Sequence, residues 1–147
     1  MDNNSFTRTV DLNFTNFPNI STMHFSNNQL TGPMPNLTGV SSLRYVIMDN
    51  TQLQRSILVE LFGLPWLESL VLKKNQLNGT LDIGSSYGSK LQFIDLQNNS
   101  IDSLEATGYN KRLYLHNHPI CENSEENNSS APQVPSSSSS TPTNRTL

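Results

Sequence analysis

The chain has 147 residues, a formal net charge of −3 and a charged fraction of only 14%. This length suits a single domain, and nine Lys plus Arg side chains offer no cationic surface for nucleic acid and no basic cluster for an anionic membrane. One cysteine excludes an internal disulfide framework and any multi-cysteine metal site. The chain is instead rich in uncharged polar side chains, with 19 Asn and 20 Ser beside 19 Leu, and this pairing of Asn with Leu calls for an explanation.

Residues 1–16 are predicted to be a lead-in, or the remnant of a preceding repeat. They begin Met-Asp-Asn-Asn-Ser-Phe-Thr-Arg, which contains neither the apolar segment of a signal peptide nor the small-residue cleavage site that follows one. As written, we therefore expect the chain not to enter the secretory pathway. The longest apolar-rich stretch, residues 57–72, is interrupted by Glu60, Pro65 and Glu68 and falls short of the roughly 20 apolar residues of a membrane span, so no span is expected.

Residues 17–121 contain a repeated unit of the form Leu-x-x-Leu-x-x-Leu-x-Leu-x-x-Asn-x-Leu. The polar slot of this unit is spaced by 23, 24, 24 and 19 residues along the chain. The slot residues of the five copies are Asn28, Thr51, Asn75, Asn99 and His118. Because a repeat at such a period decides the whole architecture, we predict about four repeats and a degenerate fifth.

Each Leu-x-Leu pair predicts a short strand with period-two alternation. In the third copy, Leu70 and Leu72 are expected to point inward, and Val71 and Lys73 outward. One such unit cannot bury its apolar side chains alone. Successive strands are therefore predicted to stack into a parallel sheet over a continuous core, which makes the chain a repeat solenoid.

Asn28, Asn75 and Asn99 are predicted to form a ladder where each strand ends and the chain turns inward. An Asn amide both donates and accepts hydrogen bonds, so it can satisfy backbone groups that a turn leaves unpaired. This role explains why a polar residue recurs in an apolar frame.

The outward-facing strand positions should form the concave surface, where solenoid proteins usually bind their partners. The candidate binding residues are His24, Tyr45, Ile47, Asp49, Val71, Lys73, Phe93, Asp95, Gln97, Tyr114 and His116. Tyr45, Phe93 and Tyr114 stand out, because aromatic side chains without a core role are enriched in recognition patches. The alternative is that a short or irregular array tucks each ring against a loop, but as a patch the three favour binding.

His116, His118, Cys121 and Glu122 are metal-ligand types close together in the sequence. His118 fills the polar slot of the last copy, Pro119 fixes the turn after it, and no fourth ligand recurs elsewhere. We therefore prefer a cap on the last repeat and expect no metal and no cofactor. Nothing places a base beside the cysteine, and no phosphate-cradling loop, kinase signature, nucleophile elbow or carboxylate pair is present, so no enzymatic activity is expected in this chain.

Residues 122–147 contain three Glu, three of the eight Pro and an unbroken run of five Ser at 136–140, which predicts a disordered tail. Nine Asn-x-Ser/Thr sequons occur in the chain. The candidate glycosylation sites in and before the repeats are Asn13, Asn19, Asn36, Asn78 and Asn98. An Asn- and Ser-rich chain makes such triplets by chance, but many together favour an ancestry in the secretory pathway.

Several segments resemble those of a known family and occur in the same order. Leu-Thr-Gly-Pro-Met-Pro at 30–35 and Leu-Asn-Gly-Thr-Leu at 77–81 resemble the plant-specific leucine-rich repeat. Together with Asp-Leu-Gln-Asn-Asn at 95–99, Leu-Tyr-Leu at 113–115 and Pro-Ile-Cys at 119–121, they resemble the membrane-proximal repeats of plant leucine-rich repeat receptor-like serine/threonine kinases. The resemblance covers residues 13–121 or thereabouts.

The resemblance implies an α/β-type repeat solenoid, a plant-type horseshoe segment with a short-stranded parallel sheet on the concave face and a convex side that is mostly loop and 3-10 turn. It also implies a receptor ectodomain segment at the extracellular face of the plasma membrane that binds a protein or peptide ligand or a co-receptor, while signalling belongs to a kinase absent from this chain. Cys121 would be a capping cysteine, but the second cysteine of the family is missing. A stand-alone decoy or scaffold protein and a non-functional truncated product are the alternatives.

Overall fold

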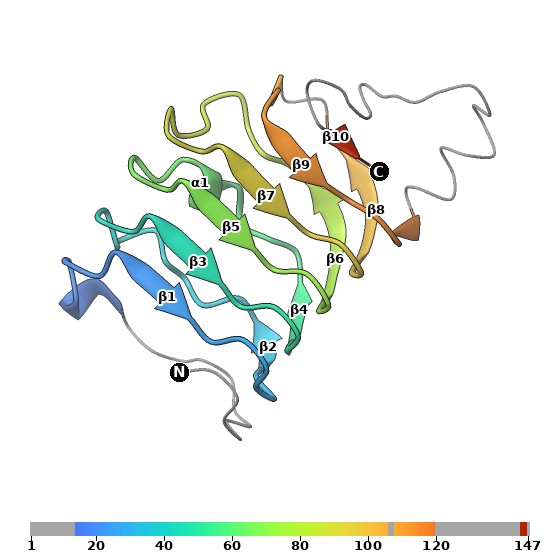
Figure 1. Cartoon of the computed structure of the whole chain (residues 1–147), viewed down its shortest axis with the longest axis horizontal. Coiled ribbons are helices and arrows are strands. Elements are labelled where there is room, and N and C mark those ends of the chain that lie inside the picture. Colours follow the sequence, from blue (N-terminus) through green and yellow to red (C-terminus); the bar gives the residue numbers. More distant parts are fainter. Residues whose placement is uncertain (1–13, 106–107, 120–144, 147) are drawn as a thin grey trace.

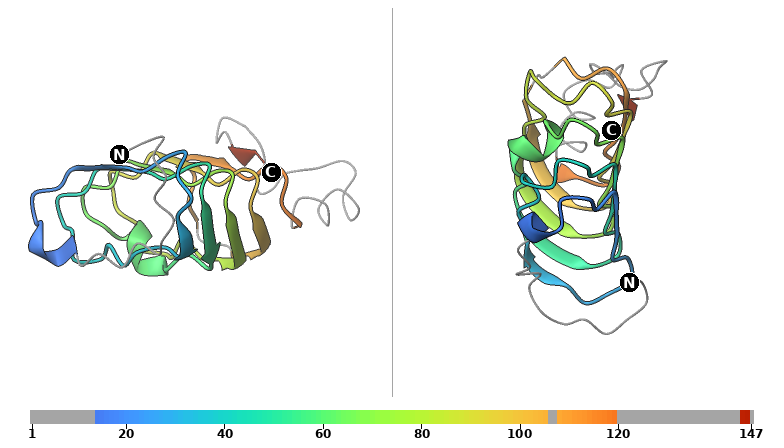
Figure 2. Two further views of the ribbon diagram at one scale, coloured as in Figure 1. Left: turned by 90° about the horizontal axis from the view of Figure 1, so that it is seen from below. Right: turned by 90° about the vertical axis from the view of Figure 1, so that its left-hand side faces the viewer.

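The strands lie in two parallel sheets, and each of the first four repeats contributes one strand to each sheet (Figure 1). The computed structural model describes residues 14–105, 108–119 and 145–146. The turns of the chain stack one behind another, as the two views in Figure 2 show. The predicted repeat solenoid with a short-stranded parallel sheet is thereby confirmed.

The first sheet carries the predicted concave face. It contains, in spatial order, β1 (Thr22–His24), β3 (Tyr45–Ile47), β5 (Ser69–Val71), β7 (Phe93–Asp95), β9 (Arg112–Tyr114) and β10 (Arg145–Thr146). The central residues of the first five strands lie in register and are at most 3% exposed. These residues are Met23, Val46, Leu70, Ile94 and Leu113. The period of two therefore divides each three-residue strand into one core side chain and two outward ones.

The second sheet was not predicted from the sequence. It contains β2 (Thr31–Pro33), β4 (Gln52–Arg55), β6 (Gln76–Leu81) and β8 (Ser100–Leu104). Leu53, Leu77 and Ile101 point into the core, while exposed residues such as Gln54, Gln76 and Asp102 face outward. In the first four repeats a second strand thus begins next to the apolar residue that follows the polar slot, where the sequence suggested only a turn.

The side of the stack opposite the first sheet is formed mainly by loops. The one α-helix among the described residues is α1 (Val59–Phe62), which buries Leu61 and Phe62. In the next repeat Gly88 occupies the first apolar slot. A Cβ atom at this position would lie 2.4 Å from the backbone oxygen of Leu64, so a larger residue would clash. No helix of the described residues is long and apolar enough to cross a membrane.

The two ends of the array differ. The 3-10 turn η1 (Phe14–Asn16) puts Phe14 into the core, whereas Phe17 is 56% exposed in a slot where Val40 and Leu64 are buried. At the other end, β10 pairs in parallel with β9. The rest of the predicted lead-in and tail, residues 1–13 and most of 122–147, lies outside the described residues.

Candidate functional site

The polar slots tie neighbouring repeats together. The Asn75 Oδ1 atom accepts a hydrogen bond from the Leu53 N–H at 3.0 Å, and its Nδ2 donates to the oxygens of Met48 at 2.8 Å and Leu72 at 3.0 Å. Leu53 and Met48 belong to the repeat before Asn75, and Leu72 belongs to its own. Each such side chain therefore links its strand end to that of the preceding repeat.

Asn99 repeats the same pattern one period later. Its Oδ1 accepts from the Leu77 N–H at 3.0 Å, and its Nδ2 donates to the oxygens of Leu72 and Leu96, both at 2.9 Å. Asn28, in the first repeat, donates to the oxygen of Phe25 at 2.9 Å. All three Asn side chains are buried, so their amides replace water as the partners of these backbone groups.

Two other residue types occupy the same slot. Thr51 donates its hydroxyl hydrogen to Asn75 Oδ1, which adds a side-chain bond between rungs. His118 takes the place of the amide in the last repeat: its Nδ1 accepts from the Ile101 N–H at 3.0 Å and its Nε2 bonds to the Leu96 oxygen. Burial lowers the pKa of His118, and its bond to Leu96 offsets this only in part.

A second row of Asn side chains lies on the surface beside the buried rungs, and sequence reasoning missed it. The residue just before each slot has a φ between 55° and 58°. These residues are Asn27, Asn50, Lys74, Asn98 and Asn117. Asn50 donates to Asn27 and Asn117 donates to Asn98, both at 2.7 Å, and Lys74 interrupts the row. Asn tolerates the left-handed region better than most residues. The Asn that stands directly before the slot in four of the five copies was therefore the available signal in the sequence.

Most of the predicted binding residues lie on the first sheet with partly accessible side chains. Those that are half-buried are Tyr45, Ile47, Asp49, Val71, Lys73, Phe93, Gln97, Tyr114 and His116, and His24 is exposed. Asp95 is the exception and corrects the prediction, since it is only 6% exposed. It lies in register between Val71 and Tyr114, and its carboxylate accepts the Gln97 N–H at 3.2 Å, so it folds back onto its own chain.

The apolar side chains of this surface lie on four neighbouring strands, and we call them the aromatic patch: Tyr45, Ile47, Val71, Phe93 and Tyr114. Ile47 and Val71 are paired in register on β3 and β5. The rings of Phe93 and Tyr114 have centroids 5.5 Å apart. The guanidinium of Arg112 lies 5.1 Å from the Phe93 ring centroid, where a cation–π interaction is favourable.

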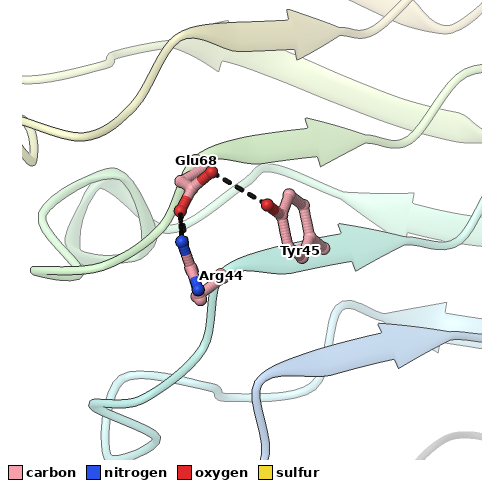
Figure 3. Close-up of polar contacts among 3 residues, drawn as sticks. All are labelled: Arg44, Tyr45 and Glu68. Carbon is pink, nitrogen blue, oxygen red and sulfur yellow. Dashed lines mark hydrogen bonds and ion pairs between the residues drawn. The ribbon is translucent and has the colours of Figure 1, made fainter.

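One edge of the aromatic patch is fixed by a polar cluster that the sequence did not reveal (Figure 3). Glu68 accepts from Arg44 Nε at 2.7 Å and from the Tyr45 hydroxyl at 2.9 Å. The Arg44 bond is the main cause, and the Tyr45 bond the second, of a lowered pKa for Glu68. The same contact raises the pKa of Tyr45. At this exposed site the bonds orient the Tyr45 ring and add little to stability.

Of the four suggested metal ligands, the structure describes the two histidines, which lie in different surroundings. His116 is on the outer face of the first sheet and His118 is buried in its slot, while Cys121 and Glu122 lie outside the described residues. No group of three or more His, Cys, Asp or Glu side chains that could hold a metal exists among residues 14–105, 108–119 and 145–146.

The described sequon residues, Asn19, Asn36, Asn78 and Asn98, are all exposed, and Asn13 lies outside the described residues. Asn36 is held in a local turn because its Oδ1 accepts from the Thr38 N–H at 3.1 Å and from the Thr38 hydroxyl at 2.7 Å. Asn98 belongs to the surface row, where its Oδ1 accepts from Asn117.

The stacked parallel strands, the Leu core and the buried Asn rungs together define a leucine-rich repeat protein. No family model matches the chain. Over 113 residues, 75% of its length, it is 30% identical to a probable leucine-rich repeat receptor-like protein kinase of Arabidopsis thaliana and spans 12% of that protein. The resemblance to the repeats of plant leucine-rich repeat receptor-like kinases is therefore confirmed, and the kinase part of this relative is not covered.

Solved structures support the same class. The fold is similar to that of a TDR receptor, with a TM-score of 0.59 and 28% identity over 67% of this chain and 17% of that one. It is also similar to that of a plant ice-binding protein, with a TM-score of 0.63 and 20% identity over 78% of this chain and 41% of the other. Because the plant ice-binding protein is only 20% identical to this chain, that similarity concerns the fold alone.

Proposed function

We propose that the chain is a protein-interaction module, the part of a plant receptor ectodomain that binds a protein or peptide ligand or a co-receptor through its first sheet. The observation that carries the proposal is the aromatic patch, in which five apolar side chains stay partly accessible on one face. Aromatic side chains that a protein leaves accessible beside aliphatic ones are the usual anchors of binding energy.

The surroundings of the aromatic patch support this function. Arg44 and Glu68 lie just before β3 and β5, at one edge of the patch, and Asp49 and Lys73 follow the same strands at the opposite edge. An apolar centre with a polar rim is the common anatomy of protein interfaces. The strands beneath are anchored by core side chains that are almost fully buried, so the surface is preformed and little ordering is needed on binding.

The similarity to receptor kinases supports the same proposal. In the full receptor, the repeats would lie at the extracellular face of the plasma membrane and the kinase would transmit the signal. The exposed sequons Asn19, Asn36, Asn78 and Asn98 are open to glycosylation in that location. Asn78 lies on β6 of the second sheet, so a glycan there would leave the first sheet free.

The test is a selection of peptides from a random library on the wild-type chain, followed by affinity measurements on variants. The triple variant Tyr45→Ala, Phe93→Ala, Tyr114→Ala should weaken the selected peptides at least 100-fold while leaving the circular dichroism spectrum unchanged. The control variant Trp66→Ala removes a large exposed ring that lies outside the first sheet, at 52% exposure, and should change affinity less than threefold. Equal affinities of the triple variant and the wild type would refute the proposal.

A further inference from the structure

His118 stands where Asn75 and Asn99 stand in the repeats before it, but only His118 can gain a proton near neutral pH. Its ring reproduces the amide: Nδ1 accepts from the Ile101 N–H, as an amide oxygen would, and Nε2 donates to the Leu96 oxygen, as an amide nitrogen would. This arrangement requires a neutral ring with its hydrogen on Nε2.

A proton on Nδ1 would destroy the bond to Ile101, because two N–H groups would then face each other. It would also place a positive charge on a side chain that is 1% exposed. The charged groups described on neighbouring elements offer no compensation: the Asp95 carboxylate is bonded to the Gln97 N–H, Asp102 on β8 is exposed, and Arg112 on β9 is a cation. As far as the described residues go, burial lowers the pKa of His118 and the bond to the Leu96 oxygen raises it by a smaller amount.

The direction of the pH effect follows from the lowered pKa. His118 is harder to protonate in the folded state than in the unfolded state, where a histidine has its ordinary pKa of 6.5. The stabilisation from the rung is therefore complete above that value and declines as the pH falls through it toward the folded-state value.

The rung joins a small unit whose other attachments include the Asn117 bond to Asn98 Oδ1 and the burial of Leu113 and Leu115 in the core. The last repeat is bound to the array by the pairing of β9 with β7 and by backbone bonds from Leu96 N to the Tyr114 oxygen at 3.0 Å and from Asn98 N to the His116 oxygen at 2.8 Å. The strand that it secures carries Tyr114, whose ring packs against Phe93 in the aromatic patch.

We propose that His118 is a pH-sensitive clasp: the last repeat, and with it the Tyr114 end of the aromatic patch, is held in place while the imidazole is neutral and is released when the imidazole is protonated. The proposal deepens the proposed function by adding acid sensitivity to the same surface. His118 is a positioning residue here, since it acts through β9 and touches no partner.

Hydrogen–deuterium exchange of the full chain at pH 7.5 and 5.0 tests the clasp without any ligand. After correction for intrinsic exchange rates, the protection of amides in residues 109–118 should fall at least tenfold at pH 5.0, while amides of β3 and β5 keep theirs. His118→Asn supplies a rung that cannot titrate and should abolish this fall. The matched control His116→Asn changes the half-buried histidine two residues away and should retain it.

A wild type that keeps full protection at pH 5.0, or a His118→Asn variant with the same fall as the wild type, would overturn the clasp. If His118→Asn does not fold, the wild type alone decides: the protection of residues 109–118 must decline as the pH falls below about 6.5 and level off once the His118 ring, followed by NMR, is fully protonated. Protection that stays constant over this range, or that keeps falling after the ring is protonated, refutes the proposal. Failure of the clasp leaves peptide binding at pH 7.5 intact, whereas failure of the proposed function abolishes the effect of the triple variant, so the two outcomes are distinguishable.

Discussion

Replacing Asn75 with alanine tests the ladder at its best-connected rung. The change leaves the Leu53 N–H without its partner and removes one donor each from the oxygens of Met48 and Leu72, of which the Leu72 oxygen keeps Asn99 Nδ2. A buried polar group left without a partner costs about 1–3 kcal/mol. The Leu53 N–H carries this cost in full and the Met48 oxygen in part, so we expect a total loss of about 2–4 kcal/mol. This is a large fraction of the free energy of unfolding of an ordinary domain, which is roughly 5–15 kcal/mol.

The assay is urea unfolding followed by far-ultraviolet circular dichroism, with Gln76→Ala as the matched control. Gln76 is the next residue, is exposed, and makes a long 3.4 Å bond to Gln54, so its loss should change the free energy of unfolding by less than about 0.5 kcal/mol. Asn75→Asp keeps the acceptor for the Leu53 N–H but places a carboxylate oxygen against the oxygens of Met48 and Leu72, so it should lose at least as much stability as Asn75→Ala. Equal unfolding midpoints for Asn75→Ala and Gln76→Ala would refute the role of the rung.

Three further variants probe the backbone and the edge of the aromatic patch. Lys74→Asn should raise stability by about 0.5–1 kcal/mol, because Lys74 is the one non-Asn residue in a row with φ near 57°; an unchanged melting temperature would contradict this. Arg55→Gly should stabilise by a similar amount, because Arg55 has φ 70° where the equivalent Gly32 and Gly79 have 84° and 76°, and a lower urea midpoint would show that the Arg side chain matters more than the backbone. Arg44→Ala should leave the melting temperature unchanged, because its ion pair is exposed, and a clear drop would disprove that view.

The part of the fold that repeats locally could be predicted from the sequence. Leu70 and Leu72 point inward and Val71 and Lys73 outward because a strand alternates with period two, and a buried polar slot recurs because every strand end leaves similar backbone groups to satisfy. The identity of His118 as the last rung was visible from the spacing alone, although its two hydrogen bonds were not.

The features that depend on neighbouring repeats could not be predicted. Asp95 looks like any outward residue in its own repeat, and its neighbours in register, Val71 and Tyr114, belong to the repeats on either side. Likewise, Arg44 and Glu68 are 24 residues apart and meet because the two repeats stack. The second sheet escaped notice because its strands carry no Leu-x-Leu pair and gain their stability from pairing across repeats.

The direction of the rungs has a consequence for how such an array can change in evolution. Asn75, Asn99 and His118 each bond to the repeat before them, so these three units carry the connection to their predecessor within their own sequence. A gene duplication or deletion of one whole period therefore brings or removes a complete joint and requires no matching change elsewhere. In the last unit the polar slot follows after 19 residues instead of 24, and its side chain still bonds to the preceding repeat. The number of residues between slots can therefore vary as long as the slot residue is retained.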